Sequence, residues 1–182
     1  MSIRNKRREL AIESMADHLL NEGMSGARLR SLAAAAGTSD RMLLYYFADK
    51  DELLEATLDR LASRLTDVLQ EAIPDGTRLT FPDLLLAVWQ AVRLVELQPY
   101  MRLWLELAAG AAQHLQPHRT VAGSIMTGFL DWIAARLAED ENADVRPRSA
   151  LLLAMVEGAL LLDTAGKPDL AELAVTRAAS GF

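Results

Sequence analysis

The chain has 182 residues, 51% of them hydrophobic, which excludes a disordered chain and suits one domain or a small domain joined to a larger one. It is too short for an eight-stranded α/β barrel, which takes about 250 residues. The absence of cysteine excludes disulfides, thiolate catalysis and cysteine-ligated metal centres, and with three histidines we expect neither a metal nor a cofactor. The net charge of −6 by itself argues against nucleic acid as a partner.

No segment has the pattern of an export signal or a membrane span. The basic start, residues 1–10, is not followed by an apolar run. The longest apolar stretch, residues 150–162, is interrupted by Glu157 and is shorter than the ~20 residues that cross a bilayer. We therefore expect a soluble, cytoplasmic protein with no membrane partner.

Residue composition predicts an all-α chain, because Ala, Leu, Glu and Arg dominate and β-branched residues never alternate over the length of a strand. Glycines, prolines and polar runs divide it into nine helical segments, predicted at 3–22, 29–36, 40–47, 50–72, 81–97, 99–113, 119–138, 148–165 and 168–179. Gly23 is the expected end of the first segment, and Asp49 with Glu52 is the expected capping box of the fourth.

The first four segments have the layout of a helix-turn-helix domain followed by a connecting helix. In residues 32–43, small Ala residues let two helices cross closely, and Gly37 supplies the left-handed turn between them. Ser39 or Asp40 is expected to cap the second helix of the motif. Three apolar residues are expected to clamp the pair, Leu32, Ala36 and Leu43.

Over about residues 8–60 the sequence resembles the TetR family of bacterial transcription regulators, with the spacing from Gly37 to Phe47 to Lys50 kept without insertion. The matching residues are Gly23, Leu32-Ala33, Ala36-Gly37, Ser39, Leu43, Tyr45, Phe47, Lys50 and Glu52-Leu53-Leu54. The resemblance implies a DNA-binding domain over residues 1–48 and a helical ligand-binding and dimerisation domain over residues 49–182. It also implies a homodimeric regulator, a repressor released from a palindromic DNA operator by a mostly apolar small-molecule effector.

The resemblance implies a set of DNA-binding residues, carried over by position: Arg30, Asp40, Arg41, Met42, Tyr45, Tyr46 and Lys50. Arg41 suits bidentate reading of a guanine, and Met42 suits contact with a thymine methyl group. Arg30 and Lys50 begin helices and suit phosphate contacts, while Tyr45 falls where the family places an aromatic residue at the DNA backbone.

Three positions depart from the family pattern. Leu44 replaces a frequent Tyr, Arg41 a frequent Gly, and Arg28 the Thr that caps the second helix, which leaves that helix uncapped or capped by Ser25. Leu44 and Arg28 give some weight to an alternative function, a helical protein-interaction module without specific DNA binding. An enzyme is not expected, because no nucleophile–base pair, paired carboxylate motif or glycine-rich phosphate loop is present.

Charge is divided unevenly along the chain. Residues 1–50 hold eight Lys or Arg and six Asp or Glu, a balance of +2, whereas the remainder holds 11 and 19, a balance of −8. Four of the basic residues lie within residues 1–8. They form either a basic arm before the first helix, on phosphates or in the minor groove, or a solvated terminus.

The last segments suggest a subunit interface. Residues 150–162 are apolar nearly all round the helix, so they need partners on two sides. The second partner is either the same helix of another subunit, giving a four-helix interface, or other helices of a monomer. The predicted dimer residues are Leu151, Met155, Gly158, Ala159, Leu162 and Leu173.

Most aromatic residues of the chain lie in the fifth to seventh segments. Together with Met they suit a mostly apolar ligand, although for any single one of them an ordinary hydrophobic core is the favoured interpretation. The predicted ligand-pocket residues are Trp89, Tyr100, Trp104, Met126, Phe129 and Trp132.

Overall fold

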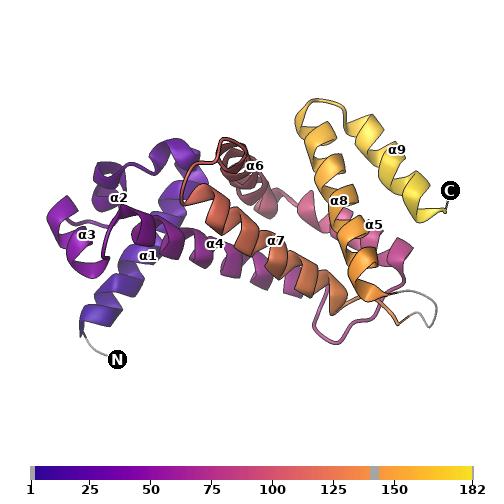
Figure 1. Ribbon diagram of the computed structural model, residues 1–182, viewed down its shortest axis with the longest axis horizontal. Helices are drawn as coiled ribbons and strands as arrows, with labels where there is room; N and C mark the ends of the chain where they lie inside the picture. The colour runs from indigo at the N-terminus through magenta and orange to yellow at the C-terminus, as the bar shows by residue number, and fades with distance from the viewer. Residues whose placement is uncertain (1–2, 140–143, 182) are drawn as a thin grey trace. The chain divides into compact units, whose positions relative to one another are not determined.

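The computed structural model describes residues 3–139 and 144–181, and within them the chain is all-α, as predicted (Figure 1). Those residues form nine α-helices and two short 3₁₀ helices, with no strand. The elements are α1 (Ile3–Glu22), η1 (Gly23–Gly26), α2 (Leu29–Ala35), α3 (Asp40–Tyr46), α4 (Lys50–Ala72), α5 (Phe81–Val92), η2 (Val95–Leu97), α6 (Gln98–Ala112), α7 (His118–Ala134), α8 (Val145–Thr164) and α9 (Pro168–Ala179). No helix among the described residues is long and apolar enough to cross a membrane.

Helices α1, α4 and α9 have the predicted bounds, and α2, α3 and α6 differ from theirs by one residue at one or both ends, but three other predictions are wrong by more. The fifth segment is not one helix over 81–97, because α5 ends at Val92 and η2 follows. The seventh ends at Ala134 instead of 138, since the next residues exchange backbone hydrogen bonds with Leu79. The eighth begins at Val145, three residues early, because the Asp144 side chain accepts the Arg146 N–H over 3.1 Å.

The local capping predictions are confirmed for two of the three helices concerned. The Asp49 carboxylate accepts the Glu52 N–H over 2.8 Å at the start of α4, and Ser39 caps α3 by accepting the Met42 N–H over 3.3 Å. Helix α2 has Arg28 at its N-cap without a side-chain hydrogen bond. Ser25 does not cap it, because its hydroxyl donates to the Glu22 carbonyl.

Contacts within the chain divide it into two compact units. Unit one comprises Met1–Asp67 and Glu96–Ile125, and unit two comprises Val68–Val95 and Met126–Phe182. Helix α4 contributes residues to both units, so the core of unit one extends beyond residue 48 along the chain. The functional boundary between residues 48 and 49 stays a prediction.

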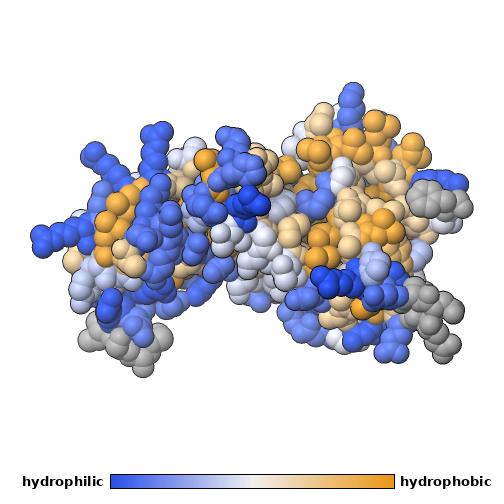
Figure 2. Space-filling model, viewed as in Figure 1, coloured by the Kyte–Doolittle hydropathy of each residue, from blue (hydrophilic) through white to orange (hydrophobic). Residues whose placement is uncertain are grey.

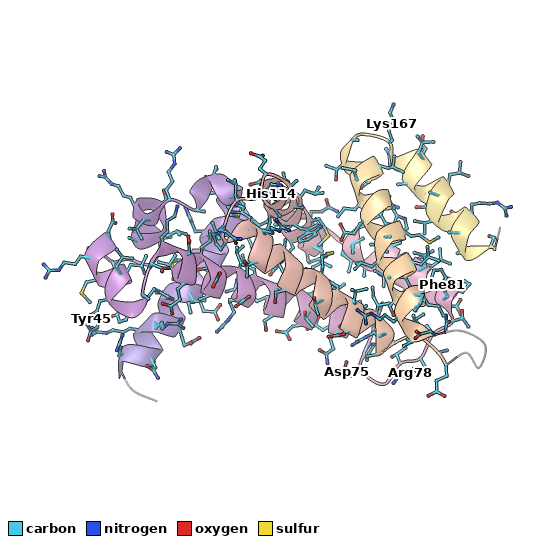
Figure 3. All side chains as sticks on the ribbon, in the orientation of Figure 1. Tyr45, Asp75, Arg78, Phe81, His114 and Lys167 are labelled. Atoms are coloured by element: carbon cyan, nitrogen blue, oxygen red, sulfur yellow. The ribbon has the colours of Figure 1, made fainter. Side chains whose placement is uncertain are left out.

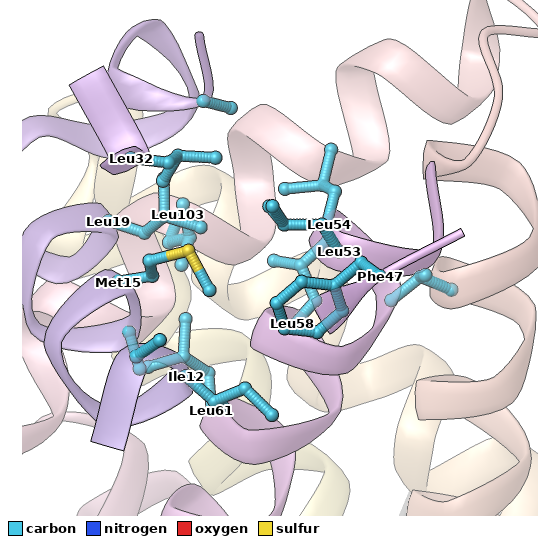
Figure 4. Close-up of a cluster of buried hydrophobic side chains, with 14 of the residues drawn as sticks. Ile12, Met15, Leu19, Leu32, Phe47, Leu53, Leu54, Leu58, Leu61 and Leu103 are labelled. Carbon is cyan, nitrogen blue, oxygen red and sulfur yellow. The ribbon is translucent and has the colours of Figure 1, made fainter. Parts of the chain in front are cut away.

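Unit one is built around a hydrophobic core that joins the helix-turn-helix to α1, α4 and α6 (Figure 4). Leu32 of α2 and Leu43 of α3 are both fully buried in it, as the clamp prediction requires, and Ala36 packs against its edge. Gly37 makes the turn between α2 and α3 with φ of 63°, a conformation that L side chains rarely adopt. The turn and the clamp together fix the direction in which α3 leaves the core.

Helix α6 holds the end of α1 through two side chains one helical turn apart. Glu106 accepts the Met24 backbone N–H over 2.6 Å, and Arg102 donates to the backbone carbonyls of Leu20 at 2.6 Å and Asn21 at 3.2 Å. These bonds satisfy backbone groups that the end of a helix leaves without partners. They depend on Gly23, because a Cβ there would lie 2.6 Å from both carboxylate oxygens of Glu106.

Replacing Gly23 by Ala is therefore expected to lower the free energy of unfolding by about 1–3 kcal/mol. Alanine disfavours the left-handed backbone conformation of this position, and its Cβ would displace the Glu106 carboxylate. Urea unfolding monitored by circular dichroism measures the change. Gly128→Ala is the matched control: Gly128 lies within α7, and nothing within 4 Å would meet its Cβ. That variant is expected to be neutral or more stable by up to ~1 kcal/mol, so equal decreases in the two variants would contradict a specific role for Gly23.

In unit two, α8 and α9 form an antiparallel pair, and α5 packs against both (Figure 1). Arg136, just after α7, is buried and joins this unit's loops. Its Nε donates to the Ile73 carbonyl over 2.8 Å, and one terminal nitrogen pairs with Asp75 at 2.6 Å. Figure 3 places Asp75 and Arg78 on the loop that these contacts hold.

Candidate nucleic-acid interface and ligand site

Helix α3 presents an exposed face that is supported by two anchors. Leu43 and Phe47 lie in the core of unit one, so the opposite side of this seven-residue helix faces solvent. A short helix is unstable alone, and these anchors supply the packing that keeps it folded. Four of the predicted DNA-binding residues lie on this exposed face, Asp40, Arg41, Met42 and Tyr45.

The other three predicted DNA-binding residues differ in exposure. Arg30, in the first turn of α2, and Lys50, at the start of α4, are exposed. Tyr46 is half-buried, packs against the core of unit one and meets the Tyr45 ring edge-on at 5.6 Å. Leu44, which sequence reasoning treated only as a missing tyrosine, is 42% exposed and adds an apolar contact surface next to Tyr45.

The basic residues near the N-terminus lie in α1 and do not form an arm before it. Arg4 lies over the Tyr45 ring and donates to the Tyr45 carbonyl, while Arg8 lies over the Phe47 ring. Sequence reasoning missed these interactions, and only the spacing of four residues between the two arginines hinted that they share a helix face.

A shallow hollow of about 330 Å³ lies beside the helix-turn-helix, where the sequence predicts no ligand site. It is formed by α1, the turn after α2, and α3. Its lining residues are Arg7, Leu10, Ala11, Ser14, Ala36, Gly37, Thr38, Met42 and Tyr46. None of the predicted ligand-pocket residues lines it.

The predicted pocket residues are divided between the two units. Tyr100 and Trp104, on α6, are half-buried against the core of unit one. The other four belong to unit two. Met126 and Phe129 are half-buried, and Trp89 and Trp132 are buried.

The two buried tryptophans of unit two differ in how their indole N–H groups are satisfied. Trp89 donates to Glu172 of α9 over 3.0 Å, and Arg93 pairs with the same carboxylate at 2.8 Å. Trp132 is 9% exposed, and its Nε1 has no hydrogen-bond partner among the described residues. The Arg136 guanidinium covers the Trp132 ring at 4.0 Å. Trp132 is therefore the predicted pocket residue with an unused polar group.

Helices α8 and α9 carry an exposed apolar face, which Figure 2 shows as hydrophobic side chains gathered over these helices. Leu151 and Gly158 are exposed at helical spacing on α8, and Leu173 is 64% exposed on α9. Leu161 and Leu170, at 61% and 50%, join them. Helix α8 is therefore not covered on every side within the single chain, and its burial by a second subunit stays a prediction.

The remaining predicted dimer residues are less accessible. Met155 and Leu162 are half-buried, whereas Ala159 is 3% exposed and packs inside its own chain. Leu161, and not Ala159, lies on the exposed side of α8, because side chains two positions apart on a helix point in directions about 200° apart.

The model of the family described as "Bacterial regulatory proteins, tetR family" matches residues 14–57, which contain the helix-turn-helix. The chain is 36% identical over 74 residues to the HTH-type transcriptional regulator BetI of Klebsiella pneumoniae, covering 39% of this chain and 38% of that protein. It is 28% identical over 166 residues to the HTH-type transcriptional regulator PksA of Bacillus subtilis, covering 86% and 78%. The match with BetI thus spans less than half of that relative.

Similar solved structures cover nearly the whole chain. A putative TetR-family transcriptional regulator from Rhodococcus sp. matches with a TM-score of 0.71 and 21% identity, over 94% of this chain and 95% of that one. The multidrug binding protein EbrR complexed with proflavin matches with a TM-score of 0.65 and 22% identity, over 93% and 95%. The helix-turn-helix of this chain, residues 14–57, therefore belongs by sequence to the TetR family of bacterial regulatory proteins, and the helical layout of the chain has the fold of a solved TetR-family regulator.

Proposed function

We propose that this chain is a ligand-responsive, homodimeric transcriptional repressor that binds a palindromic DNA operator and is released from it by a mostly apolar small molecule. The exposed face of α3 carries the proposal. It offers a cation, Arg41, between the N-capped start of the helix and two apolar or aromatic groups, Met42 and Tyr45. Arg41 suits hydrogen bonds to guanine, Met42 suits the methyl group of thymine, and Tyr45 suits the sugar-phosphate backbone.

Two copies of the chain are needed to read a palindrome, and the apolar face of α8 and α9 supports pairing. A two-fold interface places the same patch of both subunits together, so Leu151, Leu161 and Leu173 would be buried twice. The paired helices of two subunits then form a four-helix arrangement. To read the two halves of a palindrome in successive turns of the major groove, the two α3 helices would have to lie one helical turn of DNA apart, about 34–36 Å.

The effector site is proposed among the aromatic residues of unit two. Met126, Phe129 and Trp132 supply an apolar lining, and the unpartnered indole N–H of Trp132 suits a hydrogen-bond acceptor on the effector. EbrR, which has a similar fold, is complexed with proflavin, so a fold of this kind can hold an aromatic small molecule. A mostly apolar molecule with one acceptor therefore fits these residues.

Coupling between effector and DNA is proposed to run through α4 and α6. Helix α4 anchors four leucines in the core of unit one, and its arginines Arg60 and Arg64 pair with the acidic residues of α1. Helix α6 holds the end of α1 through Arg102 and Glu106. An effector that favours another position of either helix would thereby turn α3 away from the operator.

Selection of duplexes from a random-sequence DNA library by the full-length protein tests this function. A palindrome is expected to emerge. Arg41→Ala should weaken binding to it about 5–150-fold and relax sequence preference at one position, because the variant cannot form the bidentate hydrogen bonds to a base. Lys50→Ala should weaken selected and scrambled duplexes alike and lower the slope of log affinity against log salt by about 1, because one phosphate is no longer neutralised.

Lys167→Ala is the matched control, because it removes one exposed positive charge from the turn between α8 and α9. Its binding to the selected palindrome should equal that of the unchanged protein. If no palindrome is selected, the repressor proposal fails and the alternative, a helical interaction module without specific DNA binding, takes its place.

A further inference from the structure

Two arginines of α1 reach the C-terminal end of α3. Arg4 donates from a terminal nitrogen to the Tyr45 backbone carbonyl over 3.1 Å, and its guanidinium lies 4.9 Å from the centre of the Tyr45 ring. One turn later, Arg8 lies 4.5 Å from the centre of the Phe47 ring and pairs with Glu52 at 3.3 Å. Helix α1 therefore contacts both the last turn of α3 and the first turn of α4.

These interactions meet a specific need of α3. The helix has only seven residues, and its last carbonyls have no partner within the helix. A guanidinium at a helix C-terminus satisfies such a carbonyl and interacts favourably with the helix dipole. Tyr45 is 59% exposed, and its ring contacts the Arg4 guanidinium and meets the Tyr46 ring edge-on.

We propose that Arg4 is a positioning residue for operator binding, which acts through Tyr45 by holding its ring and the last turn of α3 in place, and does not itself contact a phosphate. The proposal rests on the proposed function for its effect on DNA, but its effect on α3 exists without DNA. The geometry favours it because the Arg4 guanidinium already uses one nitrogen and one face on Tyr45.

A direct phosphate contact and a positioning role make different predictions. A cation that binds a phosphate contributes about 0.9 to the slope of log affinity against log salt, and its effect adds to that of Tyr45. A positioning residue leaves that slope nearly unchanged. Its effect also disappears once the Tyr45 side chain is gone, because the two residues then act as one unit.

The experiment compares the full-length protein with Arg4→Ala, Tyr45→Ala, the double variant, and Lys6→Ala. Lys6 is the matched control, an exposed cation on the same turn of α1. Amide hydrogen exchange of residues 43–47 is measured without DNA. Affinity for the palindrome selected by the unchanged protein is then measured at several salt concentrations, and the decrease seen for Lys6→Ala is taken as the general effect of removing one charge.

Arg4→Ala is expected to speed exchange in residues 43–47 about fivefold to tenfold and to weaken operator binding by a similar factor, beyond the decrease seen with Lys6→Ala. In the Tyr45→Ala background, the same substitution should change affinity less than about twofold. The proposal would be overturned if Arg4→Ala left the amide exchange of residues 43–47 unchanged. It would also be overturned if the loss of affinity added to that of Tyr45→Ala and the slope of log affinity against log salt fell by about 1. If no palindrome is selected, the proposed function fails, and the exchange measurement still decides whether Arg4 holds α3.

Discussion

Replacing Leu173 by Asp is expected to convert the proposed dimer into a monomer. Leu173 is 64% exposed in the single chain, and burial of a leucine contributes about 2 kcal/mol. A two-fold interface contains the residue twice, and the substitution also places a carboxylate in an apolar environment. The dimer dissociation constant should therefore rise by at least about 1000-fold, which corresponds to about 4 kcal/mol.

Sedimentation equilibrium over a range of protein concentrations measures this change. Leu10→Asp is the control, because Leu10 is similarly exposed, at 58%, but lies on α1 in unit one. It should leave the dimer unchanged. Dissociation of the dimer should also weaken binding to the selected palindrome by about 100-fold or more, since each monomer then binds its half-site independently. A dimer that tolerates Leu173→Asp would place the subunit interface elsewhere on the chain.

Replacing Arg136 by Ala is expected to lower the free energy of unfolding by about 3–5 kcal/mol. Arg136 is 2% exposed and donates to the carbonyls of Ile73 and Trp132 and to the carboxylate of Asp75. Without it, the two carbonyls lose their donor, the Trp132 ring loses its covering cation, and a hole remains. Asp75 itself is mostly exposed and returns to water, so the decrease should lie near the lower end of the range.

Urea unfolding at one fixed protein concentration measures this decrease, since a dimer's apparent stability depends on concentration. Arg78→Ala is the control, because Arg78 also donates to a backbone carbonyl at the end of α7 but is exposed. It should change stability by about 0.5 kcal/mol or less. Arg136→Lys should fall between the two, because an ammonium group cannot replace the forked guanidinium. Equal decreases for Arg136→Ala and Arg78→Ala would show that burial of Arg136 has no role in stability.

The helices and their turns are largely readable from the sequence. The breakers Gly23 and Gly37 and the caps Ser39 and Asp49 act on neighbouring residues, so local patterns report them directly. The errors occur where a distant segment intervenes. The seventh helix ends early because its last residues bond to Leu79, more than 50 residues away in the chain.

In the candidate site too, some features were predicted from the sequence and others depend on a distant segment. The resemblance to the family assigned Arg41, Met42 and Tyr45 to the DNA-binding set by position, and all three are exposed on α3, opposite the buried Leu43 and Phe47. Periodicity does not reveal that Arg4, 41 residues earlier, lies on Tyr45. For α8, an apolar sequence all round left two alternatives, and the exposure of Leu151 and Leu161 in the single chain leaves pairing with a second subunit as a proposal.

The sequence by itself determined the all-α class, the helix-turn-helix and the uneven charge, since each depends on residue type and spacing within a few helical turns. The tertiary structure decided which side chains meet across helices: Arg4 with Tyr45, Glu106 with the turn at Gly23, and the buried Arg136 with the loop at Ile73 and Asp75. These interactions join residues 41 to 82 positions apart. They depend on how whole helices pack, which no local pattern of hydrophobic and polar residues specifies.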